Sequence, residues 1–122
     1  MNRYIIEGIL RDLAAGRTVL VVSPTARDVQ QAHRAALLHL DPRANLGTLY
    51  PHTPGYAWNA ANGTARLHDV TTEAIAFYRA LHNADGVEAD VIVVDGVRRM
   101  VDDTDPGGLA TLTAGRDVVL ID

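Results

Sequence analysis

The sequence contains no cysteine and no lysine, and these two absences exclude several kinds of chemistry. Without cysteine the chain has no disulfide bond, no thiolate metal ligand and no thiol nucleophile. All 11 basic residues are arginine, so a phosphate-loop lysine, a Schiff base and a lysine general base are excluded as well. A bias toward arginine codons in a GC-rich genome accounts for this composition.

Long apolar runs and a strong net charge are also missing. No run of about 18 or more apolar residues occurs, so no membrane-spanning helix is predicted. The start of the sequence has no signal-peptide layout, which makes the cytoplasm the expected compartment. The formal net charge of −4 argues against a strongly electrostatic nucleic-acid binder, although it does not forbid a local basic patch. A single domain is expected over residues 1–122.

Apolar periodicity along the chain predicts alternating helices and strands. Helices are expected over 3–15, over 26–40, and from Thr71 or Thr72 to about Ala84, and one or two helical turns are expected over 107–113. Continuous β-branched runs typical of buried parallel strands occupy 18–22, 91–94 and 118–121, and a short strand is expected over 46–50.

A tight-turn signal, Asn62-Gly63, predicts a hairpin with arms at about 56–60 and 64–67. Strands that alternate with helices indicate right-handed crossovers and parallel pairing. The expected fold class is therefore α/β, with a mostly parallel sheet of about three to five strands flanked by helices.

Three segments occur in a distinctive order: GRTVLVVSPT at 16–25, NGTARL at 62–67 and ADVIVVD at 89–95. The first resembles the second core strand of helicases and viral DNA-packaging terminases, which ends in a Pro-Thr loop that touches nucleic acid. The second is similar to the Asn-Gly-Ser hairpin of terminase motors. The third resembles a Walker B strand, and 116–122 resembles the sensor strand. The resemblance implies a truncated RecA-like core with a β-hairpin insertion and a bacteriophage origin.

The departures from that family concern its catalytic parts. A phosphate loop reads G-x-x-x-x-G-K-[ST], and no such segment is present. In the family a strand and this loop precede the first helix, whereas this sequence starts at about that helix. The family's catalytic glutamate follows the Walker B aspartate, and Gly96 takes its place here, so no group is expected to orient an attacking water. Neither enzymatic activity nor a cofactor is therefore predicted.

The missing phosphate-loop strand is central in the family fold. Its absence predicts either a rearranged sheet or an exposed apolar strand edge, and such an edge is a template for pairing with another chain. We therefore expect a homo-oligomeric ring, tube or filament built from heterologous contacts. The expected function is that of a non-catalytic, self-assembling module with a structural or partner-binding role.

Two other function classes stay open. One is a nucleic-acid-binding accessory protein, with DNA or a host or phage protein as its partner. The other is an NTPase subunit that a partner's phosphate loop completes in trans. For the first class, a local patch is expected from residues near the Pro-Thr loop and from scattered arginines: Ser23, Thr25, Arg27, Arg66, Arg98 and Arg99.

Further candidates are aromatic or acidic. Tyr56 and Trp58 lie beside prolines, where they would stack on bases or anchor a partner, with core packing of Trp58 as the competing interpretation. Asp95 is the candidate Mg²⁺ ligand that the resemblance implies, and capping of the next turn is its competing role. Arg98 and Arg99 would alternatively pair with the acidic residues at 102–105 of a neighbouring copy. No other metal ligand is predicted.

Overall fold

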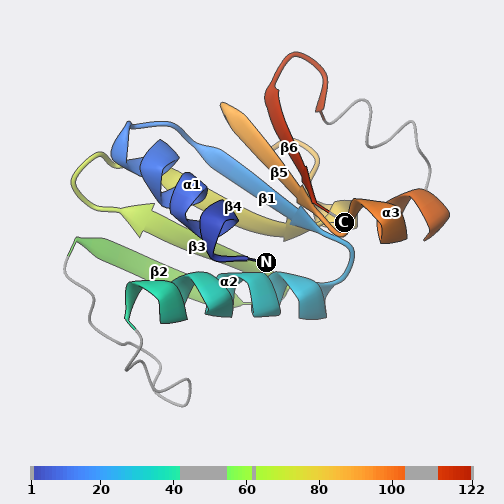
Figure 1. Cartoon of the computed structure of the whole chain (residues 1–122), viewed down its shortest axis with the longest axis horizontal. Helices are drawn as coiled ribbons and strands as arrows, with labels where there is room; N and C mark the ends of the chain where they lie inside the picture. Colours follow the sequence, from blue (N-terminus) through green and yellow to red (C-terminus); the bar gives the residue numbers. More distant parts are fainter. Residues whose placement is uncertain (1, 42–54, 62, 104–112, 122) are drawn as a thin grey trace.

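The computed structural model describes residues 2–41, 55–61, 63–103 and 113–121, which form an α/β fold with helices against one sheet (Figure 1). Along the chain the elements are α1 (Arg3–Ala14), β1 (Val19–Ser23), α2 (Ala26–Leu40), β2 (Tyr56–Ala61), β3 (Thr64–Asp69), β4 (Ile75–Ala80), the 3-10 helix η1 (Leu81–Asn83), β5 (Val91–Asp95), α3 (Val97–Asp103) and β6 (Asp117–Ile121). None of the described helices is long and apolar enough to cross a membrane.

The sheet has six strands in the order β2-β3-β4-β1-β5-β6. The four strands β4, β1, β5 and β6 are parallel, whereas β3 runs antiparallel to both of its neighbours. The expected α/β class is therefore confirmed, but the sheet is mixed and larger than the predicted three to five strands. Because β1 pairs directly with β4 and β5, the sheet is continuous at its centre, and its open edges are β2 and β6.

The helix predicted from Thr71 or Thr72 to Ala84 is wrong, since this segment forms β4 and η1. Burial along β4 alternates with period two, because Ala76, Tyr78 and Ala80 are buried and the residues between them are half-buried. Apolar residues in this short segment also fit a helical spacing. The two adjacent strands, β3 and β1, decide the outcome by supplying backbone partners on both sides.

Other local predictions are confirmed. α1 and α2 lie where periodicity places them, and α2 begins with a capping box in which Thr25 and Asp28 bond to each other's backbone. The hairpin joins β2 to β3, with Gly63 at φ +76°. The expected strand over 46–50 lies outside the described residues, as does 107–112 of the helical segment expected over 107–113.

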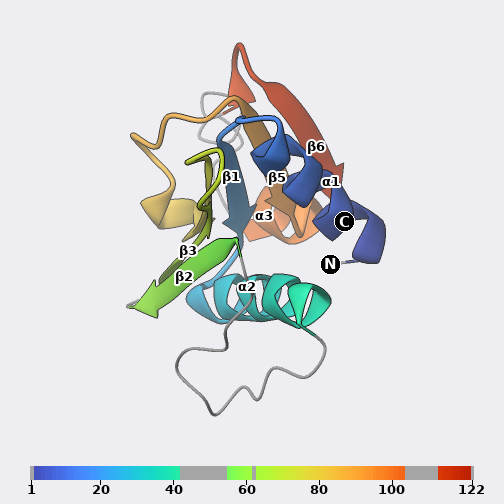
Figure 2. The ribbon, with the colours of Figure 1, turned by 90° about the vertical axis from the view of Figure 1, so that its left-hand side faces the viewer.

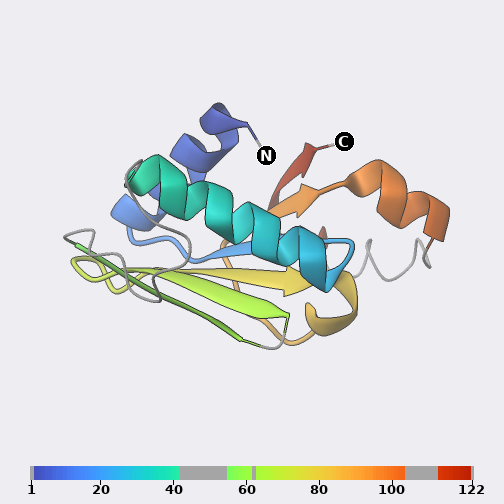
Figure 3. The same ribbon diagram turned by 90° about the horizontal axis from the view of Figure 1, so that it is seen from below.

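Two apolar layers enclose the centre of the sheet. α1 and α2 cover what we call the first face, and Figure 3 shows both helices on the same side of the strands. A second apolar layer lies on the other face, which we call the second face, beneath β1 and β5. It consists of Leu20 and Val22 from β1, Ile92 and Val94 from β5, Ala84 after η1 and Met100 from α3. In Figure 2, β1 lies near the centre of the view, with α2 below it.

A buried histidine joins α2 to the sheet. His33 is only 4% exposed, and its Nε2 lies 2.9 Å from the carbonyl oxygen of Arg66. A carbonyl oxygen only accepts, so Nε2 carries the proton and donates it. The ring also meets Tyr78 edge-on, with ring centroids 5.2 Å apart. Burial lowers the pKa of His33, and the bond to Arg66 opposes this only in part, so the folded protein holds a neutral imidazole.

This histidine predicts a loss of stability in mild acid. Because the pKa of His33 is lower in the folded than in the unfolded chain, the unfolded state binds more protons just below pH 6.5. The free energy of unfolding should thus be at its full value above that pH and should decrease as the pH falls toward 5. Chemical denaturation of His33→Gln should show a shallower decrease over this window. His82→Gln, at an exposed position, should keep the wild-type slope, and equal slopes in all three proteins would contradict the prediction.

Candidate functional site

A ligand site is expected first at the carboxyl ends of β1 and β5. These strands are adjacent and parallel, but the helices that follow them pack on opposite faces of the sheet. α2 lies on the first face, whereas Met100 of α3 belongs to the second apolar layer. In open α/β sheets, ligands bind where successive connections diverge in this way.

Contacts within the chain join the two loops at this divergence. Asp28 Oδ2 accepts hydrogen bonds from the Thr25 hydroxyl at 2.6 Å and the Thr25 backbone N–H at 3.2 Å. Its other oxygen, Oδ1, accepts from Arg99 Nη1 at 3.0 Å. Pro24 packs against Gly96, whose φ is +79°. The β1–α2 and β5–α3 loops therefore contact each other directly.

The pKa values of two carboxyl groups at this edge are shifted in opposite directions. Burial raises the pKa of Asp95, and the neighbouring Asp28 adds to the effect while Arg99 opposes it. For Asp28, burial alone would raise the pKa, but hydrogen bonds from Thr25 and Arg99 outweigh it and lower the pKa. Within the described ranges no group of three or more potential metal-binding side chains occurs, around Asp95 or elsewhere.

The approach of Pro24 to Gly96 predicts opposite effects of two glycine substitutions. In Gly96→Ala the new Cβ would lie 2.9 Å from Pro24 Cγ on a backbone with positive φ, so we expect a loss of about 1–3 kcal/mol of stability. Gly8→Ala is the matched control, because Gly8 lies within α1 with open space around it, and it should gain about 0.5–1 kcal/mol. Urea unfolding measures both, and an unchanged midpoint for Gly96→Ala would refute the assigned contact.

The structure brings together only part of the patch predicted from the sequence. Ser23, Thr25 and Arg99 lie at the carboxyl edge, and Ser23 is fully buried with no hydrogen-bond partner for its Oγ among the described residues. Arg27 lines a hollow of about 490 Å³ between α2 and the β2–β3 turn, and Arg98 is exposed on α3.

The remaining candidates lie elsewhere in the fold. Arg66 points away from α2 and lies over the ring of Phe77, with its guanidinium carbon 5.4 Å from the ring centroid. Arg66 belongs to β3, whereas Thr25 and Arg99 follow the carboxyl ends of β1 and β5. Tyr56 and Trp58 are half-buried and pack against the apolar layer on the first face. The six-residue patch is thus divided between the carboxyl edge, the α2 hollow and β3.

The outer edge of β6 is a site that the sequence did not reveal. Its apolar run predicts a buried strand, yet Val118, Val119 and Leu120 are 37%, 38% and 60% exposed. β6 pairs with β5 on one side, and no strand within the described ranges pairs with its other side. In Figure 1, β6 borders the sheet next to β5. Only the position of β6 in the strand order reveals that its hydrophobic residues face solvent.

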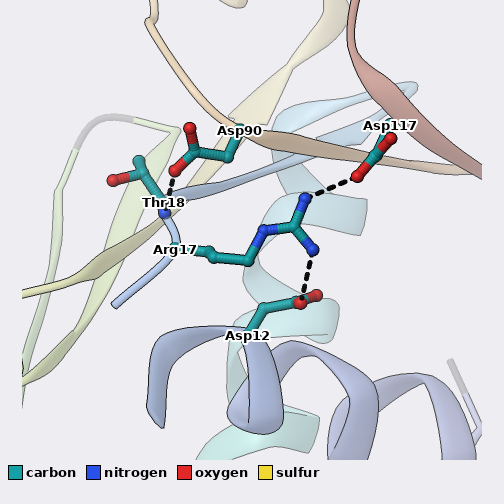
Figure 4. A network of polar contacts seen from close by, with 5 residues as sticks. All are labelled: Asp12, Arg17, Thr18, Asp90 and Asp117. Atoms are coloured by element: carbon teal, nitrogen blue, oxygen red, sulfur yellow. Dashed lines mark hydrogen bonds and ion pairs between the residues drawn. The ribbon is translucent and has the colours of Figure 1, made fainter. Parts of the chain in front are cut away.

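An arginine anchors the start of β6 to the rest of the fold (Figure 4). The two terminal nitrogens of Arg17 donate to Asp117 Oδ2 at 2.5 Å and to Asp12 Oδ1 at 3.3 Å, which joins β6 to α1. Beside them, Asp90 accepts the backbone N–H of Thr18 at 2.9 Å and so joins β5 to β1. These contacts position all four elements at the amino end of the parallel strands.

This anchor predicts a local effect on β6. Arg17→Gln removes both ion pairs, so the strand should separate from β5 more often and its amide hydrogens should exchange faster. The buried strands β1 and β5 should keep their slow exchange, since ion pairs between partly exposed groups contribute little to global stability. Arg11→Gln, which removes an exposed arginine of α1, is the control and should leave β6 unchanged. Equal exchange in both variants would show that Arg17 does not hold the strand.

Comparisons with known protein families, with curated proteins and with solved structures found no match to this chain. The function therefore has to be inferred from the residues and their geometry.

Proposed function

We propose that this chain is a non-catalytic RecA-like module whose copies assemble head to tail through the open edge of β6. The observation that carries the proposal is the exposed apolar run of Val118, Val119 and Leu120 on an edge strand. The RecA-like part rests on the order of the three sequence segments that resemble terminases and helicases. The same resemblance is the basis for a phage origin.

The edge of β6 lacks the usual devices that prevent association. Natural edge strands carry lysine, proline, a bulge or inward-pointing charges that oppose pairing with another chain. β6 reads Asp-Val-Val-Leu-Ile, and its one charged residue, Asp117, is already paired with Arg17. A second strand added here would bury apolar side chains on both faces of the sheet and satisfy outward-facing backbone groups.

The backbone groups that face outward can be identified from the pairing with β5. The N–H of Gly96 donates to the carbonyl oxygen of Ile121 at 2.9 Å, so the main chain of Ile121 faces β5. Main-chain groups alternate in direction along a strand, so those of Val119 also face β5, and those of Val118 and Leu120 face outward. Leu120 thus offers both an exposed side chain and an outward N–H.

The direction of the two edge strands favours head-to-tail contacts. β2 is antiparallel to β3, which is antiparallel to β4, and β4 is parallel to β1, β5 and β6. The two edges therefore run in the same direction at opposite ends of the sheet. Pairing β6 of one copy with β2 of the next extends one sheet across copies, and such heterologous contacts form rings or filaments.

The same carboxyl-edge contacts favour assembly over hydrolysis. A phosphate loop directs its backbone N–H groups at the nucleotide. In the β1–α2 loop the N–H groups of Thr25 and Asp28 are used by the capping box, and Asp28 also pairs with Arg99. Because these groups are engaged within the chain, the local closure supports a role that needs no nucleotide at this loop.

A proline substitution tests the proposed edge. Leu120→Pro removes the outward N–H without removing a bond to β5, so it should leave the fold intact and abolish association. Light scattering after size-exclusion chromatography should show a mass that increases with concentration for the wild type and a monomer for Leu120→Pro. Val70→Ala truncates another exposed apolar residue, between β3 and β4, and should associate like the wild type. A monomeric wild type at tens of micromolar would overturn the proposal.

The same variant distinguishes head-to-tail growth from a symmetric dimer. Leu120→Pro keeps its β2 edge, so small amounts of it should bind to the end of a growing assembly and shorten it. In a symmetric β6–β6 dimer, the variant would have no binding partner and would leave the wild-type mass unchanged. Circular dichroism and amide exchange on Leu120→Pro should show that β6 still pairs with β5.

A further inference from the structure

The second face of β2, β3 and β4 is only partly covered in the described part of the chain, where Phe77 of β4 packs against the second apolar layer. α1 and α2 pack on the first face of these strands, where Ala65, Leu67, Ala76 and Tyr78 are buried. On the second face every strand residue is half-buried or exposed. Cross-strand pairing arranges these residues in three rows: Ala57, His68 and Ile75; Asn59, Arg66 and Phe77; and Ala61, Thr64 and Arg79. We call this surface the β2–β4 platform; in Figure 3 it is the side facing away from α1 and α2.

The platform is basic although the chain as a whole is acidic. Its nine residues include two arginines and a histidine but no carboxylate, whereas the formal net charge of the chain is −4. Asp69, which also belongs to β3, is buried and accepts the backbone N–H groups of Thr71 and Thr72. The arrangement of the strands thus separates the charges that are mixed along the sequence.

The polar groups of the platform surround an aromatic ring. Arg66 lies over Phe77, and Asn59 is on the other side of Arg66 in the same row. Arg79 lies next in β4, and its Nε is enclosed without a hydrogen-bond partner among the described residues. A shallow hollow of about 170 Å³ lies between Arg66, His68 and Asn59. The surface therefore combines donors for anionic oxygens with a stacking ring.

We infer that the β2–β4 platform binds single-stranded nucleic acid. Unpaired bases stack on aromatic rings and on arginine planes, and guanidinium groups pair with the phosphates. Three strands about 4.8 Å apart span about 10 Å, which is wide enough for a few splayed nucleotides. The positive charge of Arg66 and Arg79 favours a polyanionic ligand, and the Phe77 ring favours a polyanion that carries bases. This inference does not depend on assembly through β6, since the platform residues lie on other strands.

Fluorescence anisotropy with a labelled oligothymidylate of about 20 nucleotides tests the inference. The full chain should bind it, and the affinity should decrease steeply between about 50 and 200 mM salt. Arg66→Gln and Arg79→Gln should each weaken binding and reduce the salt slope by about one. Phe77→Leu should weaken binding about tenfold with an unchanged salt slope, because a stacking partner is lost and no charge is removed.

Arg34→Gln provides the matched control, since Arg34 is an exposed arginine on α2 on the other side of the sheet. It makes the same change in charge and should bind like the wild type. Using Leu120→Pro as the background keeps the measurement on monomers and separates it from the assembly test. Absence of binding at low salt, an equal loss in Arg34→Gln and Arg66→Gln, or equally tight binding of polyglutamate would each overturn the inference.

Discussion

The parallel pairing of β1 with both β4 and β5 is the constraint on which the rest of the structure depends. All five residues of β1 are fully buried, so the strand needs an apolar layer on each face. α1 and α2 supply the first layer, and Met100 and Ala84 contribute to the second. Because the connections after β1 and β5 must reach different layers, their loops separate at the carboxyl edge and meet through Pro24, Gly96 and the Asp28–Arg99 ion pair.

In a sheet whose apolar layers are centred on one buried strand, the outer strands are less covered. β6 has an apolar composition suited to burial, but it is the last strand of the sheet, and among its described residues only Ile121 packs against an apolar layer. The β2–β4 platform is only partly covered for a related reason, since the second apolar layer lies mainly beneath β1 and β5 and reaches Phe77 alone among the platform residues. Both surfaces are on the periphery, whereas the central carboxyl edge is occupied by contacts within the chain. The two surfaces for which we propose binding therefore both lie away from the centre of the sheet.

Much of the fold was predictable because local patterns carry it. The 3.6-residue spacing in α1 and α2, the capping box of Thr25 and Asp28, the hairpin at Gly63 and the β-branched central strands all depend on neighbours in the sequence. Little of the candidate sites was predictable. Arg66 was grouped with Thr25 and Arg99, yet it lies over Phe77 on β3 while they meet at the carboxyl ends of β1 and β5, and the RecA-like resemblance stays a prediction.

The sequence by itself determined α1, α2, the two central strands and the residue types that this chain lacks, because residue identity and short-range spacing suffice for each. Tertiary structure decided that Ile75–Ala80 is a strand, that β6 lies at an edge and that arginines gather on one partly covered face. These features depend on which strands pair, and the pairing partners are distant in the sequence. Whether a β-branched run is buried is therefore set by its place in the sheet, which only the assembled fold establishes.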